Sequence, residues 1–189
     1  MEVASKMVKE LSKEIVTKVI EEDSGAHRYV LERIWDDKQP IVAVITLYPA
    51  SSELVITDTT TMLVTNNVYK LGFGGFFSVN LYSKIEFPDS PTKKERARNY
   101  KTATNKTNDQ YILEYCQKAD EIIIAVGSLP SKNKTVMQRL QSILKTLEAE
   151  GLLDKTKTLI DPVKKVSCHP LAPKVRNSWQ LEADSVFEI

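Results

Sequence analysis

The chain has 189 residues, of which 42% are hydrophobic and 27% are charged, and its formal net charge is +1. This length suits one domain with a full core, and the balanced charge excludes a global attraction to nucleic acid. No apolar run approaches the roughly 18 residues that span a bilayer, and the charged first residues lack the apolar centre of a signal peptide. The sequence therefore predicts a soluble cytoplasmic protein with no membrane association, in which Cys116 and Cys168 are free thiols.

The first predicted element is a helix, because apolar residues recur at steps of four near the N-terminus, at Val3, Met7, Leu11, Ile15 and Val19. This spacing is typical of an amphipathic helix, which we place at residues 3–22. We expect this helix, within residues 1–24, to pack on a single α/β domain formed by residues 25–189. The helix could instead be a dimer contact or a docking arm. The oligomeric state stays open, with a homodimer through the helix as one alternative.

Strands and helices alternate through the rest of the chain. Buried or short strands are predicted at residues 27–35, 41–47, 74–82, 121–126, 157–160 and 163–168, and helices at residues 58–71, 109–119 and 134–150. Several of these strands are apolar without alternation, which is typical of strands covered on both faces of a parallel sheet. The sequence therefore predicts an α/β three-layer sandwich with a mainly parallel central sheet of about four to five strands.

Polar residues and turns follow the predicted strands, at Tyr48-Pro49, Asn80, Gly127-Ser128 and His169-Pro170. In an open parallel sheet, ligands bind beyond the carboxyl ends of the strands. If these strands are parallel, their ends meet at one edge and form a cleft. Asp58 lies nearby at a predicted helix start, where its carboxylate can cap the helix, face the cleft as a general base, or do both.

Each candidate also has an ordinary structural interpretation. His169 is either a partly buried loop histidine or a donor to an oxyanion or a leaving group. Asn80 either caps a loop or uses its amide to bind the edge of a nucleobase. The long polar segment 83–108 is either a solvated loop or a contact for phosphate groups, through its basic residues Lys93, Lys94, Arg96 and Arg98.

Several familiar sites are absent from the sequence. The segment after residue 47 has no glycine, whereas a dinucleotide fingerprint needs glycines there to admit a pyrophosphate. The two histidines and two cysteines have no zinc-site spacing, and no G-x-S-x-G elbow supports a serine hydrolase. We therefore expect no metal and no cofactor.

Five ordered stretches resemble the bacterial family known as domain of unknown function 1643: HRYVLERIWDD (27–37), VITLYPASSE…TDTTT (44–61), YKLGFGGFFSVNLYS (69–83), TNDQYI…ADEIIIAVG (107–127) and CHPLAP (168–173). The first block of that family reads G-L-N-P-S-T-A followed by D-D-P-T. Here Thr46 replaces the glycine and Tyr48 replaces the asparagine. The resemblance implies membership of a family without an assigned activity.

A more distant resemblance is to the uracil-DNA glycosylase superfamily, whose G-x-N-P-like loop, strand-end asparagine and His-Pro loop would correspond to Leu47-Tyr48-Pro49, Asn80 and His169-Pro170. It implies a uracil-DNA glycosylase-like fold. It also implies that Asn80 binds the base, that His169 stabilises the departing base, and that Asp58 orients water in place of the missing asparagine. Tyr48 would then stack on the base.

Three functional hypotheses follow. The first is a glycosylase-type hydrolase that acts on an N-glycosidic bond in a nucleotide or nucleic acid. The second is a module that binds a nucleobase, nucleotide or nucleic acid in the same cleft without turnover, which the changes at Thr46 and Tyr48 favour. The third is an interaction protein with a degenerate cleft.

Overall fold

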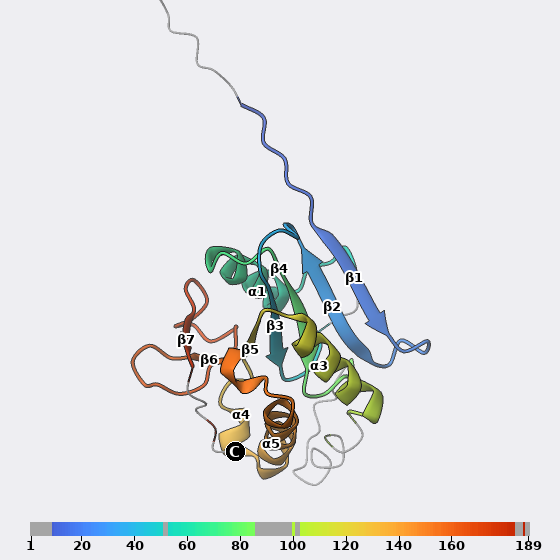
Figure 1. The fold of residues 1–189 in the computed structure, drawn as a ribbon, viewed down its shortest axis with the longest axis vertical. Coiled ribbons are helices and arrows are strands. Elements are labelled where there is room, and N and C mark those ends of the chain that lie inside the picture. Colours follow the sequence, from blue (N-terminus) through green and yellow to red (C-terminus); the bar gives the residue numbers. More distant parts are fainter. Residues whose placement is uncertain (1–8, 51–52, 86–99, 101–102, 184–186, 188–189) are drawn as a thin grey trace, which may run out of the picture.

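The computed structural model describes residues 9–50, 53–85, 100, 103–183 and 187 (Figure 1). The predicted phosphate-binding residues Lys93, Lys94, Arg96 and Arg98 lie outside this part of the chain. The described strands are β1 (Val16–Glu21), β2 (Arg28–Ile34), β3 (Ile41–Thr46), β4 (Gly75–Asn80), β5 (Glu121–Ile124), β6 (Thr156–Ile160) and β7 (Gln180–Glu182). The described helices are α1 (Thr59–Lys70), α3 (Lys106–Lys118), α4 (Leu129–Lys132), α5 (Lys134–Ala149) and the 3-10 turn η1 (Leu153–Lys155).

The strands form one mixed sheet of seven strands in the order β1-β2-β4-β3-β5-β6-β7. The pairings of β3 with β4, β3 with β5 and β5 with β6 are parallel, whereas β1 with β2, β2 with β4 and β6 with β7 are antiparallel. The predicted α/β class is confirmed, but a mainly parallel sheet of four to five strands is wrong. Continuous apolar runs reveal covered strands, yet they carry no information on strand direction, and the outermost strands lack such runs.

The N-terminal amphipathic helix is also wrong. Residues 16–21 form strand β1, and residues 9–15 have no regular secondary structure. Residues 1–8 lie outside the described part of the chain. The step-of-four spacing was misleading because Val16, Thr17, Val19 and Ile20 are β-branched, and β-branched side chains favour a strand that packs beside another strand. Here the partner is β2, which pairs with β1 along its whole length.

A second correction concerns residues 163–168, which form a turn and not a strand. The Asp161 carboxylate accepts hydrogen bonds from the backbone N–H groups of Val163 and Lys164, at 2.8 and 3.0 Å. The chain then reverses, and Ser167 forms an isolated antiparallel bridge with Ile160 at the end of β6. His169 therefore follows a reversed segment instead of ending a parallel strand.

Apolar side chains cover both faces of the sheet. On one face, α3 and α5 pack through residues such as Ile112, Leu140 and Leu144. On the other face, Val64 and Val68 of α1 pack beside Val175 and Trp179 of the segment after β6. Asn67 of α1 holds this segment by donating a hydrogen bond of 2.9 Å to the carbonyl of Arg176. We call these the α3/α5 face and the α1 face.

Gly74, just before β4, marks a close approach between two backbone segments. The backbone N–H groups of Trp35 and Asp36 both donate to the Gly74 carbonyl at 2.9 Å. A Cβ atom at position 74 would lie 1.8 Å from the Asp36 carbonyl oxygen. Only glycine allows this approach, so the connection from α1 to β4 depends on it.

We expect Gly74→Ala to destabilise the fold by about 1–3 kcal/mol, the usual cost of overpacking. Denaturant unfolding measures the change. Gly25→Ala is the control for replacing a glycine without a steric clash. Position 25 has a φ of 71° and open space around it, so this variant adds backbone strain alone. Equal stability of Gly74→Ala and the wild type would contradict the close approach.

Candidate functional site

An irregularity in β2 decides where Arg28 points. Ile20 of β1 pairs with Val30, but the next residue, Glu21, pairs with Arg28, so Tyr29 is an extra residue in β2. Such a β-bulge shifts the side-chain alternation and re-aims the residues beyond it. Tyr29 and Val30 pack on the α3/α5 face, while Arg28 turns to the α1 face.

Arg28 is only 3% exposed and begins a buried polar network. Its Nη2 donates a hydrogen bond of 3.2 Å to Oδ1 of Asn80, and Nδ2 of Asn80 donates one of 2.6 Å to the Thr46 hydroxyl. Burial lowers the pKa of Arg28 to about 10, and the negative charge of Asp58 opposes this shift. The guanidinium therefore stays charged at neutral pH inside the protein, beside an acid.

Asp58 caps α1, as predicted. Its Oδ1 accepts hydrogen bonds from the N–H groups of Thr60 and Thr61, at 2.8 and 3.1 Å, and its Oδ2 accepts one of 2.6 Å from the Thr61 hydroxyl. A carboxylate offers about four acceptor positions. These bonds occupy three, so Oδ2 keeps capacity for one further donor.

A small polar recess on the α1 face brings Arg28, Tyr48 and Asp58 together. The Thr46, Thr61 and Ser78 side chains add hydroxyl groups to its wall, and Val64 and Phe76 add apolar surface. Tyr48 is 45% exposed, so its ring is accessible at the recess. The wall thus offers donors, acceptors and an aromatic surface within one small space.

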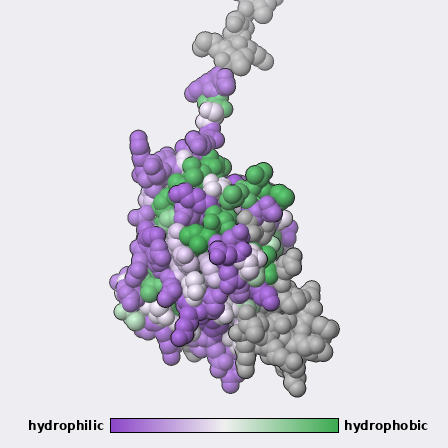
Figure 2. Space-filling view, turned by 90° about the vertical axis from the view of Figure 1, so that its right-hand side faces the viewer, coloured by the Kyte–Doolittle hydropathy of each residue, from purple (hydrophilic) through white to green (hydrophobic). Residues whose placement is uncertain are grey.

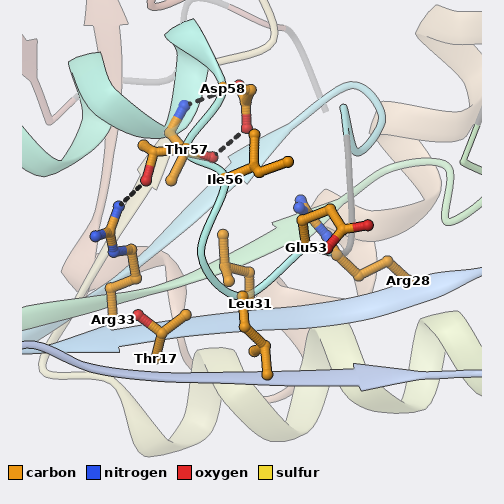
Figure 3. A pocket seen from close by; sticks show the side chains of 10 residues that line it. Thr17, Arg28, Leu31, Arg33, Glu53, Ile56, Thr57 and Asp58 are labelled. Atoms are coloured by element: carbon orange, nitrogen blue, oxygen red, sulfur yellow. Dashed lines mark hydrogen bonds between the residues drawn. The ribbon is translucent and has the colours of Figure 1, made fainter.

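A second recess borders Arg28 and Asp58 and is drawn in Figure 3. Glu53 and Arg28 overlap in this view, and Arg33 donates a hydrogen bond of 3.3 Å to the Thr57 hydroxyl. This bond ties segment 53–57, which leads into α1, to strand β2. Arg28, Glu53 and Asp58 all line this second recess.

Gly127 and His169 form a separate pair at the ends of β5 and the reversed segment. A Cβ atom on Gly127 would lie 3.0 Å from the His169 Cβ, so these two residues are in contact. The predicted approach of positions 127 and 169 is therefore present.

The other two predicted binding residues lie in different surroundings. Pro49 is buried, and Ser128 is exposed at the start of α4, where its side chain makes no capping bond.

His169 is half-buried and holds one tautomer. Its Nδ1 accepts a hydrogen bond of 3.2 Å from the backbone N–H of Leu171, which leaves the hydrogen of a neutral ring on Nε2. Burial lowers the pKa of His169 below its usual 6.5. The imidazole is therefore neutral at neutral pH and can donate a hydrogen bond from Nε2.

The structure thus brings the predicted residues together in two groups. Tyr48 and Asp58 share one recess, with Asn80 behind it and bonded to Arg28. Gly127 and His169 lie at the end of β5, two strand positions from β4, or about 10 Å across the sheet. Asn80 has no exposed surface and both ends of its amide are occupied, so its amide does not face the recess.

Arg28 is the main residue that the sequence interpretation missed. It begins a strand as an ordinary basic residue, and nothing in HRYVLERIW shows the bulge at Tyr29. Thr46 and Ser78 were also missed as wall residues. A basic residue next to an apolar strand is a weak signal without the partner strand that defines the register.

Within the described residues, no helix has the length and apolar character to cross a membrane. The same part of the chain contains no cluster of three or more histidine, cysteine, aspartate or glutamate side chains placed to hold a metal ion. Both cysteines are free and buried.

Comparison with known proteins found one family. The model of the family described as "Protein of unknown function (DUF1643)" matches residues 28–171, which include Arg28, Tyr48, Asp58, Asn80 and His169. Neither the curated proteins nor the solved structures yielded a match.

We expect Asn80→Ala to destabilise the fold by about 1–3 kcal/mol, because it leaves Arg28 and Thr46 with fewer partners in a buried place. Denaturant unfolding measures the loss. Asn66→Ala, at an exposed position of α1, is the control and should be neutral. If the two variants were equally stable, the network would not be holding β3 and β4 at this edge.

We expect the His169 imidazole to titrate below pH 6.5, because burial disfavours its charged form. The unfolded chain then binds the proton more tightly than the folded one. The folded state is therefore favoured by the neutral form of His169. This stabilisation is complete above pH 6.5 and is lost as the pH falls through the folded pKa. An NMR titration of a His27→Gln variant follows His169 alone, and a midpoint above 6.5 would contradict its burial.

Proposed function

We propose that this chain, which belongs to the DUF1643 family, binds a nucleobase or nucleotide in the recess formed by Arg28, Tyr48 and Asp58. The observation that carries the proposal is the buried, charged Arg28 beside Asp58 at the wall of this recess. Burying a charge is costly, and a perturbed charged group beside a partner in a recess marks a candidate functional site.

The chemistry of the wall favours a neutral polar ring over a simple anion. Arg28 is a hydrogen-bond donor, while Asp58 can accept one further bond, so the two charges offset each other. The edge of a nucleobase presents donors and acceptors side by side in the same way. Asp58 and Arg28 therefore replace Asn80 as the groups proposed to bind the base edge.

Tyr48 supplies the third contact. Tyr48 lines the recess and is 45% exposed as a residue, and aromatic side chains stack on any nucleobase. The replacement of the asparagine by Tyr48 thus adds a stacking surface. The basic residues Lys93, Lys94, Arg96 and Arg98 remain the proposed contacts for phosphate groups, in a nucleotide or in a nucleic acid.

Binding without turnover is better supported than hydrolysis of an N-glycosidic bond. Asn80 is buried in its network with Arg28 and Thr46. Donors of α1 occupy three of the about four acceptor positions of the Asp58 carboxylate. Glycosylase-type hydrolysis is the second candidate. The observation that favours it is the neutral His169, whose Nε2 can donate to a departing base.

The proposal predicts that nucleobases, nucleosides or nucleotides raise the melting temperature of the protein, because a ligand that binds only the folded state stabilises it. Tyr48→Ala should weaken binding by about 1–3 kcal/mol, or roughly 5- to 150-fold, the usual worth of one stacked base. Calorimetric titration measures this loss.

Tyr69→Ala is the matched control, since Tyr69 is 66% exposed on α1 but does not line the recess. The proposal fails if no ligand of the three classes binds, or if Tyr48→Ala and Tyr69→Ala bind equally well. Release of free base from a nucleoside or from DNA, abolished by His169→Ala, would establish the second candidate instead.

A further inference from the structure

Strand β1 lies at one end of the sheet and has one edge without a strand partner among the described residues. Unpaired backbone N–H and C=O groups along such an edge are a template for another strand. A groove follows this edge, lined by residues of β1 together with Glu32, Glu53, Leu54 and Val55. The face that carries β1 is turned toward the viewer in Figure 2, where hydrophobic patches interrupt its polar surface.

The residues just before β1 form an arm that leaves the domain. Residues 9–15 are all exposed, and in Figure 1 they continue the line of β1 away from the other described elements. Leu11 is 79% exposed and Ile15 is 41% exposed. Lys13 forms an ion pair of 3.7 Å with Asp36. The protein thus presents an extended segment with two exposed apolar side chains, Leu11 and Ile15, which leads into a strand with an open edge.

We propose that two copies of this chain form a symmetric dimer, in which the arm of each copy pairs in antiparallel fashion with β1 of the other. The pairing is centred on Ile15, which lies opposite Ile15 of the second copy. Leu11 then lies opposite Val19 of the second copy, and Lys9 lies opposite Glu21. The same surface pairs with itself, as a two-fold interface requires.

The arm is neutral as a whole, because Lys9 and Lys13 are balanced by Glu10 and Glu14, so the charges support the pairing only at single positions. The groove carries three acids, Glu21, Glu32 and Glu53, but only one base, Lys18. The arm brings Lys9 opposite Glu21 and sets Ser12 opposite Lys18. A symmetric pairing centred on Lys18 would instead place two lysines directly opposite each other, which is destabilising.

The apolar residues also match in this register. Val19 of β1 pairs with Leu31, and Leu31 lines the recess that contains Leu54 and Ile56, so these side chains share the α1 face. Leu11 of the second copy would cover Val19 on this face, beside Leu54 and Val55, which are 55% and 90% exposed. The dimer therefore removes from water a set of apolar side chains that one copy leaves exposed.

A charge exchange tests the partner and the register together. We expect the full chain to sediment as a dimer whose dissociation constant rises about tenfold in Lys9→Glu and in Glu21→Lys, because each change opposes like charges at two symmetric contacts. The double variant should restore the dimer. Both positions are exposed, so the fold should be unaffected.

Cysteine cross-linking tests the centre of the pairing. Cα atoms of directly opposed residues lie about 5.5 Å apart in hydrogen-bonded antiparallel pairs, which suits a disulfide. Ile15→Cys should therefore form a covalent dimer on mild oxidation. Ser12→Cys is the control, because its two copies would lie about 20 Å apart in this register. The two native cysteines are buried.

The proposal is overturned if the chain sediments as a monomer at all concentrations, or if the two charge reversals leave the dimer unchanged. It is also overturned if the double variant is not restored, or if Ser12→Cys cross-links as readily as Ile15→Cys. None of these outcomes bears on ligand binding at the recess of Arg28, Tyr48 and Asp58, which lies on different side chains.

Discussion

The buried network of Arg28, Asn80 and Thr46 is the interaction on which the rest of the site depends. It joins three neighbouring strands, β2, β4 and β3, at one edge of the sheet. The guanidinium is held away from water, and Asp58 at the start of α1 supplies the opposing charge. Removing any partner would leave a buried polar group with too few hydrogen bonds, which costs more than an average hydrogen bond contributes.

The network also explains why Asn80 and Asp58 have different roles from those suggested by their positions in the sequence. Asn80 follows the pattern of a strand-end amide that faces a ligand, but Arg28 and Thr46 occupy it. Asp58 follows the pattern of a helix cap and is one, yet it still borders the recess. The wall that remains for the proposed ligand consists of Arg28, Asp58, Tyr48 and several hydroxyl groups.

Two exposed parts of the chain carry apolar side chains. The second recess, which borders Arg28 and Asp58, is lined by Leu54 and Ile56 of segment 53–57, and the apolar side chains of Leu54, Val55 and Ile56 are exposed. The arm before β1 is exposed as well, and it leads into a strand whose outer edge has no strand partner among the described residues. A second copy placed on that edge, as proposed, would extend the sheet and cover part of segment 53–57.

The sequence by itself determined the α/β class, the central strands, the three longer helices and the cap at Asp58, because these depend on local periodicity and on short-range hydrogen bonds. It also placed Gly127 and His169 near each other. Only the tertiary structure decided the direction of the strands, the strand character of residues 16–21 and the position of Arg28. These features depend on which segment pairs with which, and a bulge of one residue at Tyr29 is enough to move a charged side chain from one face of the sheet to the other.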